Sequence, residues 1–140
     1  MDAATIANCL SALAVFLVLI QLRLTSHSER QQFEDSFANQ YRELLKDLPL
    51  DALLGESRQL TREELAAFYR YFDLSNQQAF MYEKKRIRHE VWAEWCAGIR
   101  DNLALPMFAV AWESFKQARP DTFDELRRLE AGKFKAARHG

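Results

Sequence analysis

An uncharged, apolar run near the N-terminus constrains this chain more than any other feature. Residues 3–22 read AATIANCLSALAVFLVLIQL and contain no charged side chain. A run of about 20 such residues has the length that an α-helix needs to cross the hydrocarbon core of a bilayer. Residues 15–20 are apolar all round, and a soluble domain of this size could hardly cover such a helix. The sequence therefore predicts a transmembrane anchor over residues 1–24.

A cleaved signal peptide is the main alternative to an anchor. Signal peptides begin with positive charge and end at a small-residue cleavage site. Here Asp2 is the only charged side chain before the run, and the exit reads RLTSHSER. Arg23 and Arg30 follow the run, and cations gather on the cytoplasmic side of a span. We therefore predict a single-pass protein of the cell inner membrane, with its N-terminus outside and its C-terminal domain cytoplasmic.

One face of the predicted span consists of small residues. Ala3, Ala7, Ser11 and Ala14 fall at helical spacing, with Asn8 beside them. Small side chains let two helix backbones approach closely, and a membrane amide seeks a hydrogen-bonding partner. This docking face is a candidate contact for a transmembrane helix of another protein. A plain anchor, with Asn8 wetted at the interface, is the open alternative.

The rest of the chain shows helical periodicity without sustained period-two alternation, so no sheet is expected. The predicted fold is all-α, with a single N-terminal transmembrane helix followed by a four- to five-helix cytoplasmic domain. Its parts after the anchor are residues 25–60 (stalk, amphipathic helix and loop), 61–132 (helical domain) and 133–140 (basic tail). The amphipathic helix is expected to continue the span as one rod, and its apolar residues are Phe33, Phe37, Tyr41, Leu44, Leu45 and Leu48.

Several local signals mark the expected ends of the helices. Pro49 should end the amphipathic helix, and residues 50–57 read as a loop. Thr61 and Glu64 fit a capping box, and Asp121 is the expected cap of the last helix. The helix that follows the capping box should bury one stripe, formed by Leu65, Phe68, Tyr69, Phe72, Asn76, Ala79 and Phe80.

No catalytic, cofactor-binding or metal site is predicted, and we expect the protein not to be an enzyme. Glu90 and Glu94 stand four residues apart, but the Glu-x-x-His motif of di-metal helical sites is absent. His27, His89 and His139 are scattered along the chain. Arg86 is placed to pair with Glu90 at i, i+4 on a solvated helix face. The two cysteines, Cys9 and Cys96, are not expected to pair, which suggests a reducing compartment or no disulfide framework.

Large aromatic and amide side chains are expected to be structural. Trp92, Trp95 and Trp112 should belong to the core, and one found exposed would become an anchor for a partner. Asn76 lies on an apolar stripe, where a buried amide usually satisfies backbone groups or fixes how helices pair.

The densest cations are Lys84, Lys85, Arg86 and Arg88, and the tail adds Lys133, Lys135 and Arg138. They are candidate contacts for anionic lipid headgroups, where each cation contributes ~1 kcal/mol. An ordinary solvated loop and a frayed terminus are the alternative. The net charge of −1 and the lack of a recognisable module argue against a nucleic-acid partner.

The middle of the chain resembles a known family in three segments: YFDLSNQ at 71–77, WAEWCAGI at 92–99 and PMFAVAW at 106–112. They resemble a family of small bacterial proteins of unknown function that place one hydrophobic N-terminal helix before a helical domain. The resemblance covers residues 61–116. It implies a bacterial origin and a membrane location, and it brings no activity or functional residues.

The expected function is that of a non-catalytic membrane-anchored interaction protein, an accessory subunit or adaptor of a larger bacterial membrane complex. Its partners would be membrane lipid and the transmembrane helices of that complex. The alternative is a self-associating single-pass regulator or effector, a homo-oligomer without a stable hetero-partner. An enzyme on an unfamiliar helical scaffold would need a polar pocket that the sequence does not reveal.

Overall fold

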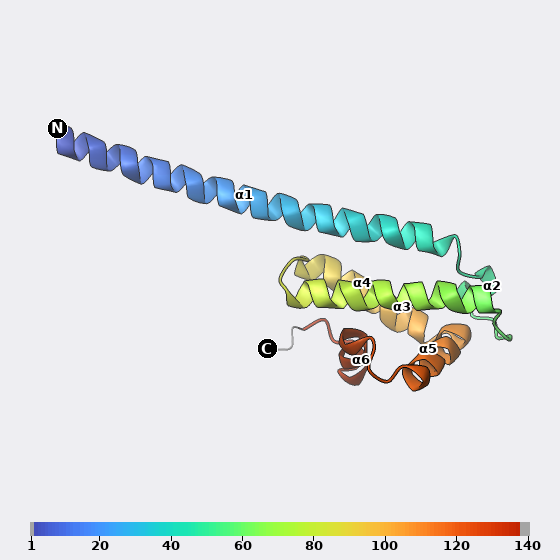
Figure 1. The fold of residues 1–140 in the computed structure, drawn as a ribbon. Helices are drawn as coiled ribbons and strands as arrows, with labels where there is room; N and C mark the ends of the chain where they lie inside the picture. The colour runs from blue at the N-terminus through green and yellow to red at the C-terminus, as the bar shows by residue number, and fades with distance from the viewer. Residues whose placement is uncertain (1, 138–140) are drawn as a thin grey trace.

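The computed structural model describes residues 2–137, and these residues form helices and no strand. The helices are α1 (Ala3–Leu45), α2 (Leu50–Leu53), α3 (Arg62–Glu83), α4 (His89–Leu103), α5 (Pro106–Ala118) and α6 (Asp124–Ala131). Figure 1 shows α1 projecting far beyond the other helices, which gather along its C-terminal part. The predicted all-α class is confirmed, as is one long apolar N-terminal helix.

The prediction that span and stalk form one rod is also confirmed. α1 runs for 43 residues without glycine or proline, and the Asp2 carboxylate caps it by accepting the Thr5 N–H at 2.8 Å. The helix ends at Leu45, shortly before Pro49. The predicted loop over 50–57 is wrong in its first half, because Pro49 begins the short helix α2. Proline holds φ near the value that starts a helix, here −65°.

α3 is the central helix, and it packs against α1, α4, α5 and α6. The single stripe predicted for it is therefore only partly right. Phe68 and Phe72 are fully buried, whereas Tyr69 and Phe80 remain 38% and 42% exposed. A second side of α3 is buried as well, because it faces α1 and α4; its residues are Tyr71, Leu74, Ser75 and Gln78.

The capping box at the start of α3 is confirmed. The Thr61 hydroxyl accepts the Glu64 N–H at 3.2 Å, and the Glu64 carboxylate accepts the Thr61 N–H at 2.9 Å. Arg58 donates two further hydrogen bonds to the same carboxylate. Arg58 first, and then the Thr61 N–H, lower the pKa of Glu64 to about 2.

The start of α6 differs from the prediction. Its N-cap residue is Phe123, in the left-handed region at φ 59°, so Asp121 lies outside the helix. Phe123 has no side chain that could cap the helix, and the cap comes from α3 instead. The Asn76 Oδ1 accepts the N–H groups of Glu125 and Leu126 at 3.0 and 3.1 Å. This confirms the prediction that Asn76 satisfies backbone groups, and it shows which helix the amide holds.

Aromatic rings fill the core around α3. Phe72 contacts Trp112 and Phe115 with ring centroids 5.1 and 5.9 Å apart. Trp92 stacks on Tyr82 at 5.2 Å, and both are buried. The core prediction is thus confirmed for Trp92 and Trp112. Trp95 is only half-buried and meets Phe37 of α1 edge-on at 5.9 Å.

Candidate functional site

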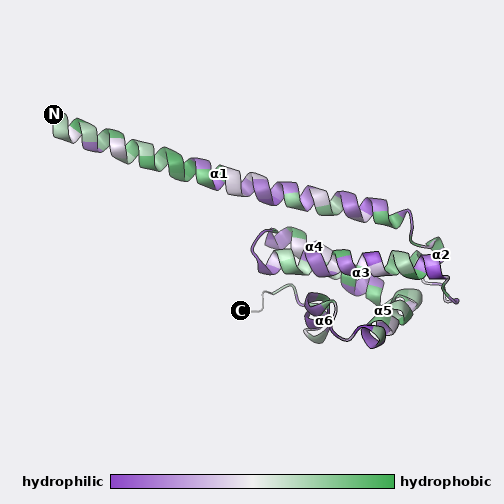
Figure 2. Ribbon diagram, in the orientation of Figure 1, coloured by the Kyte–Doolittle hydropathy of each residue, from purple (hydrophilic) through white to green (hydrophobic). Residues whose placement is uncertain are grey.

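The first half of α1 is not covered by any other described part of the chain. Its most apolar window of 18 residues has a mean hydropathy of 2.3, and none of that window is buried. Figure 2 shows the change along the rod, from mostly hydrophobic at the N-terminal end to mostly hydrophilic beside the domain. By length and composition, α1 can cross a membrane.

The docking face lies wholly on this uncovered half. Its residues, Ala3, Ala7, Asn8, Ser11 and Ala14, are all exposed. The Ser11 hydroxyl donates to the Ala7 carbonyl at 3.0 Å, which satisfies its proton within the helix. The exposed Asn8 amide, by contrast, makes no hydrogen bond to the described residues.

The second half of α1 is fastened to the domain by an ion pair. Glu34 is 5% exposed and accepts the Arg88 backbone N–H at 2.8 Å. Its carboxylate also accepts from Arg88 Nε and Nη2, at 2.9 and 2.6 Å. Burial alone would raise the pKa of Glu34, but the hydrogen bonds and charge of Arg88 lower it overall. Because Arg88 is the N-cap residue of α4, this pair fixes the rod to the start of that helix.

The predicted lipid-contacting cations fall into two groups. Arg88 is engaged by Glu34, whereas Lys84, Lys85 and Arg86 are exposed on the loop between α3 and α4. The Lys84 ammonium lies 5.2 Å from the Phe80 ring centroid, and the Arg86 guanidinium 5.3 Å from that of Phe33. The predicted Arg86–Glu90 pair is wrong, because α4 begins only at His89 and Arg86 turns toward α1.

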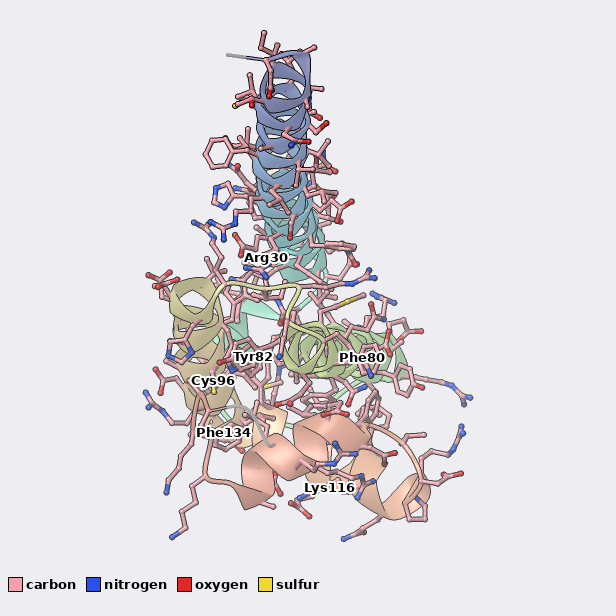
Figure 3. The ribbon with its side chains drawn as sticks, turned by 90° about the vertical axis from the view of Figure 1, so that its left-hand side faces the viewer. Arg30, Phe80, Tyr82, Cys96, Lys116 and Phe134 are labelled. Atoms are coloured by element: carbon pink, nitrogen blue, oxygen red, sulfur yellow. The ribbon has the colours of Figure 1, made fainter. Side chains whose placement is uncertain are left out.

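This loop lies at the end of the domain that faces the uncovered half of α1 (Figure 1). Figure 3 looks onto that end and shows the loop crossing beside Arg30. A notch of about 180 Å³ there is lined by Arg30, Lys85 and Arg86 together with neutral and acidic neighbours. The structure thus brings Arg30 of the rod together with two of the predicted loop cations.

The segment after α6 folds back onto the domain. Cys96 Sγ donates to the Phe134 carbonyl at 3.1 Å, and the Tyr82 hydroxyl donates to the Ala136 carbonyl at 3.1 Å. Figure 3 shows Cys96 and Phe134 near each other at this end. Burial raises the pKa of the Cys96 thiol, as expected for a structural cysteine. Lys133 and Lys135 are exposed, whereas the predicted tail residues Arg138 and His139 lie outside the described residues.

The remaining candidates for chemistry are dispersed. Glu90 and Glu94 are exposed and form no ion pair with the described residues. Among residues 2–137, no group of three His, Cys, Asp or Glu side chains is placed to hold a metal ion. His89 Nδ1 lies 2.7 Å from the Tyr82 hydroxyl, and His27 is on the exposed stalk.

Sequence reasoning missed Glu34, and it used Arg30 only as a cation that orients the span. Glu34 had a detectable signal, because it shares the 3–4 spacing of Phe37, Tyr41 and Leu44. A charge in register with an apolar face predicts a buried partner. Arg30 had no such signal beyond its charge. Comparison of the chain with known protein families, curated proteins and solved structures gives no match.

Proposed function

We propose that this chain is a non-catalytic, membrane-anchored interaction protein, an accessory subunit or adaptor of a larger complex in a bacterial inner membrane. The observation that supports it is the uncovered apolar half of α1. Eleven large apolar side chains between Ile6 and Leu24 are 38–65% exposed. Burying such a side chain is worth about 1.5–3 kcal/mol, so water is an unsuitable surrounding for this segment. Lipid and partner helices are the surroundings that fit.

The placement of cations supports a cytoplasmic domain. Arg23, Arg30 and the loop cations all follow the span, on the side where cytoplasmic cations gather. Residues 23–32 form a solvated helical spacer of roughly 15 Å between the span and the first packed residues. A tilted rod brings Lys84, Lys85 and Arg86 to the headgroups, where they add to the attraction for anionic lipid.

The docking face supports a protein partner within the membrane. Lipid chains offer no hydrogen bond to the Asn8 amide, whereas a transmembrane helix of another protein can offer one. Ala3, Ala7 and Ala14 leave room for that helix to approach closely. The bulky residues 15–20 suit contact with lipid.

The test is co-purification of the full chain from native membranes in a mild detergent, followed by native mass spectrometry. We expect a complex of fixed stoichiometry that contains another membrane protein. Substituting both Ala7→Leu and Ala14→Leu should disperse it, because the larger side chains block close approach. The control Cys9→Leu with Leu13→Phe adds similar bulk on the opposite side of the helix and should leave the complex intact.

Two other outcomes decide between the alternatives. A homo-oligomer of the chain alone would replace the adaptor proposal with a self-associating regulator. A monomer at every concentration would contradict both proposals.

A further inference from the structure

A cavity of about 360 Å³ lies between α1, α3 and α4, away from the uncovered half of the rod. Tyr41 of α1, Tyr71 of α3 and Trp95 of α4 contribute aromatic surface to it. Its volume falls within the range of about 300–1,000 Å³ that small-molecule pockets occupy. No local sequence pattern predicts this cavity, because its lining residues come from three separate helices.

One of the residues that line the cavity, Gln78, carries an amide with unused hydrogen-bonding capacity. Gln78 is only 6% exposed, yet its side chain makes no hydrogen bond to the described residues. Its amide is therefore free to hydrogen-bond a polar ligand that enters the cavity. An amide presents a donor and an acceptor side by side. It therefore matches a group that shows an acceptor beside a donor on one edge.

Apart from two charged residues at the rim, the other polar groups around the cavity are neutral. Asn102 Nδ2 donates to the Tyr71 hydroxyl at 3.0 Å, and Ser75 is hydrogen-bonded to the same hydroxyl. Burial raises the pKa of Tyr71, so its phenol stays uncharged at physiological pH. The charged lining residues, Arg42 and Glu94, are exposed at the rim. A cavity of this kind favours an uncharged ligand.

Gly98 keeps one side of the cavity open. It stands in the interior of α4, where glycine weakens a helix relative to alanine. A Cβ added at this position would meet no atom within 4 Å, so close helix packing does not require a glycine here. What the missing side chain does provide is free space at an exposed edge of the cavity.

We propose that this cavity binds a neutral nitrogen heterocycle of the nucleobase type. The planar ring packs among Tyr41, Tyr71 and Trp95, and an edge with adjacent donor and acceptor pairs with the Gln78 amide. Gln side chains recognise base edges in this bidentate way. The site is independent of the proposed adaptor role. It lies about 16 residues, or roughly 24 Å, beyond Leu22 along the rod, which places it past the headgroups and favours a water-soluble ligand.

The test measures binding of uracil and adenine to the full-length protein in detergent micelles, by ligand-observed NMR against a blank of empty micelles. For such small probes we expect dissociation constants on the order of a millimolar. 1,3-Dimethyluracil has the same ring without its N–H donors. It should bind about tenfold more weakly than uracil, because it cannot complete the pair with Gln78.

Two pairs of variants locate the site. Gly98→Phe and the smaller Gly98→Leu fill the cavity and should weaken uracil binding at least about tenfold, whereas Gly98→Ala should leave it unchanged. Gln78→Leu removes the amide and should also cost about tenfold, with exposed Gln77→Leu as its control. Near-UV circular dichroism shows that each variant is folded.

Three results would overturn the proposal: no binding of either base at 10 millimolar or so, equal binding of uracil and its dimethyl form, or unchanged binding by both folded Gly98 filling variants. None of these results bears on the co-purification experiment, so the failure of this proposal and that of the adaptor role are distinguishable.

Discussion

Residues 3–22 and residues 33–45 belong to the same helix, yet their side chains are distributed in different ways. The first segment carries no charge, is apolar all round over residues 15–20, and has no buried residue. In the second, Phe37 and Leu44 are buried against the domain while Asn39 and Glu43 face water. An apolar stripe on a helix indicates a partner in the same chain, whereas apolar residues all round indicate a different solvent.

The largest expected effect follows from deleting residues 1–24. The chain should move from the membrane to the soluble fraction, while the domain keeps its fold because none of residues 2–33 is buried. Fractionation and near-UV circular dichroism measure the two properties. If the shortened chain still sediments with membranes, the domain binds lipid by itself. Membrane binding would then not depend on residues 3–22 alone.

Phe72→Ala should destabilise the domain by about 3–5 kcal/mol, since its ring is fully buried among aromatic neighbours. Urea unfolding followed by tryptophan fluorescence in micelles measures this change. Phe16→Ala makes the same substitution at a side chain that is 59% exposed. It should leave the unfolding free energy of the domain unchanged. Equal losses for the two variants would mean that the uncovered segment packs against the domain.

Glu34→Gln should cost about 2 kcal/mol, because a buried charge-assisted hydrogen bond to Arg88 is lost. Since the folded-state pKa of Glu34 is lowered, its stabilisation is complete above the ordinary value of 4.5 and is lost as pH falls through the folded pKa. The difference in unfolding free energy between wild type and variant, measured in urea, should therefore shrink as the pH falls below 4.5. Glu29→Gln, on the exposed stalk, is the control and should show no difference at neutral pH.

Asn76→Ala should cost about 1 kcal/mol, the usual loss for removing an N-cap side chain. Hydrogen exchange at the Glu125 and Leu126 amides should speed up before the rest of the domain is affected. Gln77→Ala removes a neighbouring amide whose hydrogen bond, to Asp73, is exposed. A similar local change in both variants would show that the cap on α6 does not depend on Asn76.

Local sequence signals predicted the features that depend only on neighbouring residues. The Thr61–Glu64 capping box is one, and the continuous α1 is another. Asp121 failed as a cap because a residue 49 positions before Glu125 supplies the acceptor instead. Tertiary contacts of this kind leave no pattern in the neighbouring sequence. The same kind of contact determines which sides of α3 are buried.

The candidate sites divide in the same way. The docking face could be read from spacing along a single helix, because its five residues need no other element to bring them together. The loop cations could be found as a run in the sequence. The ion pair between Arg88 and Glu34 could not, because the two residues are 54 positions apart. The cavity around Gln78 depends on how three helices pack, which periodicity does not specify.

Because α1 contains no glycine or proline, it is a stiff helix that couples rotation of the span to rotation of the domain. Each residue turns an α-helix by about 100°. The direction in which the docking face points from the helix axis therefore fixes the direction in which the domain lies. Rotation of the span within a complex would turn the Gln78 cavity by the same angle. Insertion of one residue among 25–32 would rotate the domain about the helix axis by about 100° relative to the span. Insertion of seven would leave it within roughly 20° of its original orientation.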